Sequence, residues 1–125
     1  MIILGDKNLP YENILFVSSI EEIVNTKANS TLLFFYNLEL LKYSYENELS
    51  SAVIVTSIKD AIYSNNLNAK YIISESDLAT QIQKIADNYM YDSKNLVIIN
   101  SNEEFEQTAK AQIDGAIFKE LINQK

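Results

Sequence analysis

Short runs of consecutive apolar residues recur along the chain, and most are followed by a polar residue and then by a helical pattern. The runs are rich in β-branched and aromatic residues and do not alternate with polar ones, which is typical of parallel strands buried on both faces. They predict strands at residues 14–17, 31–36, 52–56, 71–74, 96–100 and 116–118.

The segments between these runs carry helical spacing. The clearest case is Leu78, Ile82, Ile85 and Tyr89, whose offsets of four, three and four place them on one helix face. Polar residues at the segment starts can accept hydrogen bonds from free backbone N–H groups, and so mark tight turns into helices. These predicted caps are Ser19, Asn37, Ser57, Ser76 and Asn102.

The predicted strands begin roughly twenty residues apart, close to the minimum for a strand, a helix and their two turns. This rhythm predicts one α/β domain over residues 1–125, a three-layer sandwich of five or six mainly parallel strands with helices on both faces. Both a flavodoxin-like and a half-barrel-like arrangement fit the pattern. Residues 1–4 can add an edge strand that ends at the turn-forming Gly5-Asp6.

The amino-acid composition excludes several classes of function. The formal charge of the 125 residues is −7 and every basic residue is a lysine, so neither nucleic acid nor an anionic membrane surface is an expected partner. The chain has no cysteine and no histidine, which excludes thiol chemistry and the usual hydrolase triads. We find no signal-peptide pattern and no apolar run of about 18 residues, so we expect a cytoplasmic protein.

Glycine-rich phosphate loops are absent because Gly5 and Gly115 are the only glycines. Phospho-receiver domains have a similar size, but they need carboxylates where this chain has Ser18-Ser19 and Thr56-Ser57. The acidic residues near helix starts are explained by the helix dipole. We therefore predict no cofactor and no metal site.

The segment LVIINSNEEFEQTAKAQIDGAIFKELI, residues 96–122, is similar to the last strand-helix-strand unit of phosphate-binding (β/α) barrels. In that family an I-D-G-A-I strand precedes a short helix. The family's glycines are replaced here by Asn100-Ser101-Asn102 and by Lys119-Glu120. The resemblance implies the local fold and no particular ligand.

Ligands of open α/β sheets bind beyond the carboxyl ends of the strands, where helix N-termini also point. Hydroxyl and amide side chains at that edge could hold a small anion or a sugar-like molecule, although the same residues are also explained as helix caps. The candidate ligand-binding residues are Ser19, Asn37, Ser57, Ser76, Asn100 and Ser101.

Eight tyrosines are the remaining unusual feature, since tyrosine suits half-buried positions at core margins and at protein interfaces. Tyr43, Tyr45 and Leu49 form a candidate patch for self-association or for a protein partner. Our interpretation is a non-enzymatic interaction or regulatory module that could form a homodimer. The alternative is an enzyme or sensor for a small ligand, with its site at the carboxyl edge of the sheet.

Overall fold

The computed structural model describes residues 1–27 and 29–124. These residues form one parallel sheet of seven strands, one or two more than the sequence predicted. The predicted strand near residue 116 and the predicted edge strand are both present. The strands are β1 (Ile2–Leu4), β2 (Ile14–Phe16), β3 (Thr31–Phe35), β4 (Ser51–Ile54), β5 (Tyr71–Ser74), β6 (Lys94–Ile99) and β7 (Gly115–Phe118).

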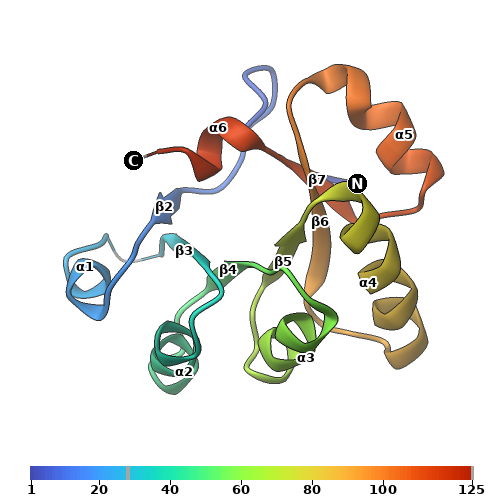
Figure 1. Ribbon diagram of the computed structural model, residues 1–125. Coiled ribbons are helices and arrows are strands. Elements are labelled where there is room, and N and C mark those ends of the chain that lie inside the picture. The colour runs from blue at the N-terminus through green and yellow to red at the C-terminus, as the bar shows by residue number, and fades with distance from the viewer. Residues whose placement is uncertain (28, 125) are drawn as a thin grey trace.

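From β2 onward the helices alternate with the strands, as the apolar pattern predicted, whereas a loop without a helix connects β1 to β2 (Figure 1). A 3₁₀ turn at Asn102–Glu104 precedes one of the helices. The helices are α1 (Ile20–Val24), α2 (Leu38–Glu46), α3 (Ile58–Asn66), α4 (Ser76–Tyr89), α5 (Phe105–Lys110) and α6 (Lys119–Ile122).

The strand order is β1-β7-β6-β5-β4-β3-β2, which curves into a half-barrel. From β2 to β7 each strand lies beside its successor in the chain, and β1 pairs with β7. This is the cyclic order of a (β/α) barrel that is open between β1 and β2. The half-barrel alternative therefore describes the molecule better than a flavodoxin-like order, in which the strand sequence reverses.

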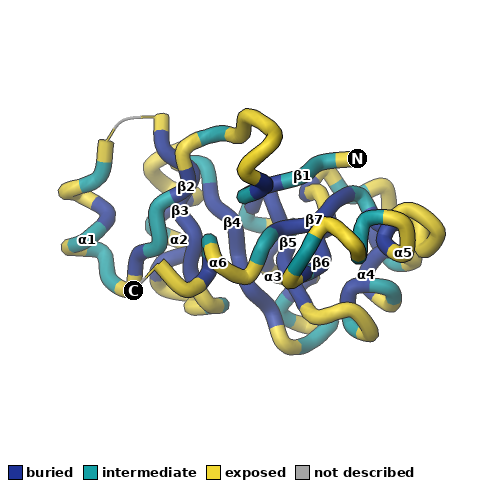
Figure 2. Tube along the Cα trace, turned by 90° about the horizontal axis from the view of Figure 1, so that it is seen from above, coloured by how far each residue is buried: buried dark blue, intermediate teal, exposed yellow. Residues whose placement is uncertain are grey.

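Helices cover both faces of the sheet, as predicted, but unequally. In Figure 1, α1 to α5 line the outer face and α6 lies on the inner face, between β2 and β7. Two apolar clusters lie between the outer face of the sheet and the helices that cover it. A third cluster fills the inner face and includes Leu121 and Ile122 of α6. The central strands are buried along most of their length in Figure 2. The fold therefore buries its strands on both sides, which explains their continuous apolar runs.

A polar cluster lies on the inner face at the end where the strands begin. We call it the Glu12 cluster, and its members are Glu12, Thr31, Lys70 and Tyr71. Glu12 accepts hydrogen bonds from the Lys70 Nζ at 2.8 Å, from the Thr31 Oγ1 at 2.5 Å and from the Tyr71 hydroxyl. Burial alone would raise the pKa of Glu12, but the hydrogen bonds outweigh it and hold that pKa below 4.5. The cluster fastens the β1–β2 connection to β3 and β5.

The edge of β2 that lies opposite its partner β3 is covered by the side chain of Gln124. The Gln124 Oε1 accepts from the Phe16 N–H at 3.1 Å, and its Nε2 donates to the Ile14 carbonyl at 3.2 Å. This amide thus occupies the place that a neighbouring strand would take. Covering an edge in this way counters strand addition between molecules.

Candidate functional site

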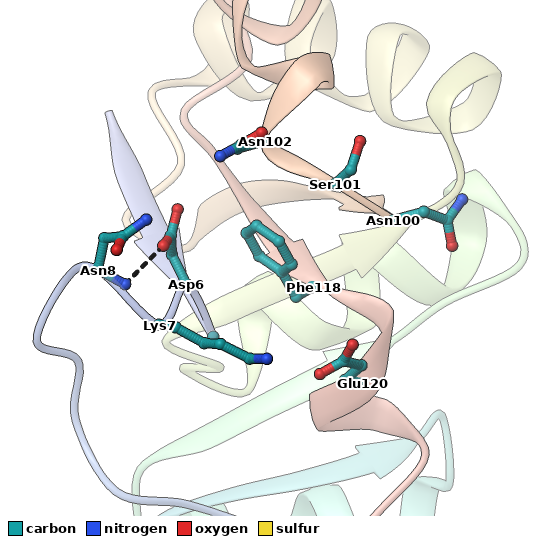
Figure 3. A pocket seen from close by; sticks show the side chains of 9 residues that line it. Asp6, Lys7, Asn8, Asn100, Ser101, Asn102, Phe118 and Glu120 are labelled. Atoms are coloured by element: carbon teal, nitrogen blue, oxygen red, sulfur yellow. Dashed lines mark hydrogen bonds between the residues drawn. The ribbon is translucent and has the colours of Figure 1, made fainter.

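The candidate site is a hollow of about 260 Å³ at the carboxyl ends of β1, β6 and β7 (Figure 3). We call it the carboxyl-edge hollow. It forms because the cyclic strand order brings the loop after β1 beside the loop after β6 and the start of α6. Its lining residues are Gly5, Asp6, Lys7, Asn8, Asn100, Ser101, Asn102, Phe118 and Glu120.

The loop after β1 forms one wall of the hollow. Gly5 has φ of +96°, a conformation that favours glycine, and turns the chain back at the end of the strand. The Asp6 Oδ1 then accepts from the Asn8 N–H at 2.7 Å, and its carbonyl accepts from the Leu9 N–H at 3.2 Å. Asp6 is only 6% exposed, so its carboxylate is held rigidly at the wall.

The loop after β6 forms the opposite wall. The Glu104 Oε2 accepts from the Asn100 N–H at 2.6 Å and from the Ser101 N–H at 3.1 Å, so one carboxylate fixes the backbone of the loop. Among the described residues, no hydrogen bond occupies the side-chain amides of Asn100 and Asn102. The Asn102 amide is therefore available to a ligand in the hollow, whereas the Asn100 side chain points away from the hollow in Figure 3.

Phe118 lies between the two walls in Figure 3. Phe105 of α5 meets its ring edge to face, with centroids 6.0 Å apart and an interplanar angle of 80°. Gly5 also lies close to this residue, since a Cβ built on Gly5 would lie 3.1 Å from the Phe118 Cβ. The hollow therefore combines a fixed apolar surface with polar walls.

Charged residues in the hollow are few. Asp6 and Glu120 carry negative charge and Lys7 carries positive charge, and the Lys7 side chain extends toward Glu120 in Figure 3. Within residues 1–27 and 29–124, no three acidic, cysteine or histidine side chains group in a way that could hold a metal ion. The hollow can offer hydrogen bonds, one apolar face and a slightly negative field.

The structure separates the six predicted ligand-binding residues. Asn100 and Ser101 line the carboxyl-edge hollow, whereas Ser76 lines a different hollow of about 220 Å³ between α4 and α5. The side chains of the other three accept the first backbone hydrogen bonds of α1, α2 and α3, as their alternative role as caps predicted. They are Ser19, Asn37 and Ser57.

Two predicted caps are wrong by one residue. The residue that caps α4 is Glu75 and Ser76 is already helical, while the 3₁₀ turn is capped by Ser101 and not by Asn102. In both loops two or three polar residues stand in a row after the strand, and each could have accepted the first hydrogen bond. This shift leaves the Asn102 amide free for the hollow.

Sequence reasoning missed Asp6, Asn8 and Phe118 as candidate site residues. The turn at Gly5-Asp6 was visible, but its place beside β6 depends on the pairing of β1 with β7. A prediction that β1 is the neighbour of the last strand would have brought these residues to the site. Phe118 ends an apolar run and has no sequence signal of its own.

The predicted interaction residues lie on and just beyond α2. Tyr43 and Leu49 line a groove of about 290 Å³, together with Val24 of α1, which is 65% exposed. We call it the α1–α2 groove. Tyr45 is exposed but does not line it.

Comparisons with known proteins give no family for this chain. No protein-family model matches it, and no curated protein matches it. Within the part of the chain that the structure describes, the helices are too short or too polar to cross a membrane. The function is therefore inferred from the site itself.

Proposed function

We propose that this chain is a cytoplasmic, non-enzymatic regulatory module that binds a small polar molecule in the carboxyl-edge hollow. The observation that carries the proposal is the pairing of a buried, fixed carboxylate, Asp6, with the unoccupied amide of Asn102 across one hollow (Figure 3). Convergent polar groups in a concavity are the usual mark of a binding site. Its place at the carboxyl ends of parallel strands is the usual one for ligands of α/β folds.

Binding is favoured over catalysis by the chemistry of the lining. The hollow offers carboxylates, amides, a hydroxyl and one amine, and the chain contains neither histidine nor cysteine to act as base or nucleophile near neutral pH. The loops that form the hollow are short and tied to the backbone at Asp6 and Glu104. Such walls can fix a ligand without a closing lid.

The proposal predicts that small polar probes change the backbone amide NMR signals of residues 5–8 and 100–102. The probes are D-glucose, glycerol, inorganic phosphate and calcium chloride, each titrated into the full chain. Asn102→Ala should weaken the response several-fold, because one hydrogen bond contributes about 1 kcal/mol. Asn66→Ala, the same change on α3, is the matched control. Unchanged signals at residues 5–8 and 100–102 with all four probes would contradict the proposal.

Self-association through the α1–α2 groove is the second candidate function. The lining of this groove includes Tyr43, Leu49 and the exposed Val24, and Lys27 is its one charged member among the described residues. In a molecule with a net charge of −7, two copies meet with little repulsion only where acidic side chains are absent. The groove meets this condition, and its apolar side chains could be buried by a second copy.

This candidate predicts a dimer by light scattering coupled to size exclusion. Leu49→Asp should produce a monomer, because it places a charge in the apolar contact. Leu9→Asp is the matched control, since Leu9 and Leu49 are 43% and 36% exposed and Leu9 lies outside the groove. A monomeric native chain at high concentration would rule out the candidate.

A further inference from the structure

We infer that the ligand of the carboxyl-edge hollow is a neutral polyhydroxylated molecule, a single sugar ring or a cyclic polyol. The inference depends on the proposed function, because it names the chemical class that the same hollow would bind. Three features of the hollow carry it: its charge, its hydrogen-bonding groups and its apolar surface.

The charge of the hollow argues against an anion. Among the described residues that line it, Asp6 and Glu120 face a single lysine, Lys7, which gives this lining a net negative charge within a molecule of charge −7. The Asp6 carboxylate is largely removed from water, which strengthens its repulsion of a phosphate or a carboxylate. No arginine is present to offset this repulsion with a bidentate contact. The sequence left two kinds of ligand open, a small anion and a sugar-like molecule, and the negative charge of the hollow favours the sugar-like molecule.

The hydrogen-bonding groups suit hydroxyls. The amides of Asn8 and Asn102 each offer one acceptor and two donors, and the Asp6 carboxylate offers acceptors only. A hydroxyl group can donate to the carboxylate and accept from an amide at the same time. Adjacent hydroxyls on one ring can therefore span the wall after β1 and the wall after β6.

Phe118 supplies the apolar surface. Its ring lies between the two polar walls in Figure 3 and packs edge to face with the Phe105 ring. A sugar ring has a face of C–H groups that can cover an aromatic ring, whereas a phosphate gains nothing from that contact. An aromatic side chain beside amides and a carboxylate thus favours a molecule with both hydroxyl edges and a C–H face.

The volume limits the size of the ligand. At about 260 Å³ the hollow is smaller than the range of roughly 300–1,000 Å³ that is usual for drug-sized ligands. One ring fits and a longer chain of sugars does not. With about 12 heavy atoms at the efficiency typical of small ligands, we expect a dissociation constant on the order of 1 mM.

The test is an NMR titration of the full chain with D-glucose, D-ribose and myo-inositol, beside inorganic phosphate and calcium chloride. At least one of the three polyols should shift the amide signals of residues 5–8 and 100–102 with millimolar affinity. Phe118→Leu should weaken binding up to about tenfold, because it removes the ring and keeps an apolar side chain. Asn102→Ala, at an exposed position, should weaken it about fivefold even if Phe118→Leu perturbs the fold. Asn66→Ala should leave binding unchanged.

The other outcomes separate this inference from the proposed function. If phosphate or calcium shifts these signals and no polyol does, the hollow is a binding site and the ligand class is wrong. If no probe shifts them, both the ligand class and the proposed function are overturned. Equal polyol affinity in the native chain and in Asn102→Ala would place the polyol elsewhere on the molecule and overturn the inference.

Discussion

Gly115→Ala is expected to destabilise the protein by about 3 kcal/mol and to detach β1 from the sheet. Gly115 pairs with Ile2 at the start of β7. A Cβ at this position would overlap the Ile2 carbonyl oxygen and would lie 2.7 Å from the Ile2 Cβ. Since the obstacle includes backbone, a side-chain rotation cannot relieve it, and the two strands must separate.

Urea unfolding followed by circular dichroism measures this effect. Ser74→Ala is the control, because it also changes a fully buried strand residue but adds no volume. The Ser74 hydroxyl has no hydrogen-bond partner among the described residues, so its removal should leave stability unchanged or raise it by about 1 kcal/mol. If Gly115→Ala were as stable as the native chain, β1 would not pair as described.

Glu12→Ala is expected to lower the free energy of unfolding by about 2 kcal/mol, because it leaves a buried hydroxyl without an acceptor. Tyr71 is 4% exposed and its hydroxyl donates to Glu12. Adding Tyr71→Phe to this variant should recover part of the loss, since removing both partners costs less than removing one. The native chain, Glu12→Ala, Tyr71→Phe and the double variant form a double-mutant cycle. Additive effects would show that the two side chains do not interact.

The same carboxylate predicts a dependence on pH. The folded-state pKa of Glu12 lies below the ordinary value of 4.5, so its ionised form contributes stability that is fully present above that value. The contribution is lost as the pH falls through the folded-state pKa. In Glu12→Gln this part of the acid dependence should vanish. Unfolding curves at neutral and acidic pH measure it, and equal acid sensitivity of both proteins would contradict the assignment.

The sequence predicted the class of fold because buried parallel strands leave continuous apolar runs, as in residues 31–36 and 71–74. It could not predict the strand order. The position of β1 depends on the close approach of Ile2 to Gly115, two residues far apart in the chain with no shared pattern. The carboxyl-edge hollow follows from that one pairing, because the pairing brings the loop after β1 to the ends of β6 and β7.

Polar contacts between distant elements were equally hidden from sequence reasoning. The Gln83 Oε1 of α4 accepts from the Asn95 Nδ2 at 3.1 Å and from the Asp114 N–H at 3.0 Å, joining one helix to β6 and to the start of β7. Gln83 and Asn95 are buried and resemble ordinary polar surface residues in the sequence. Local caps such as Ser57, whose partner is three residues away, were predictable for the opposite reason.

The pairing of the first strand with the last also sets an order of assembly. During synthesis, β2 to β6 can associate with neighbours that have just been made, but β1 must wait until Gly115–Phe118 has emerged. Because Asp6 follows β1 and Phe118 ends β7, the hollow cannot exist before β7 has been made. A ligand that binds there would recognise only molecules in which β1 has joined β7, and its binding would favour that step of folding.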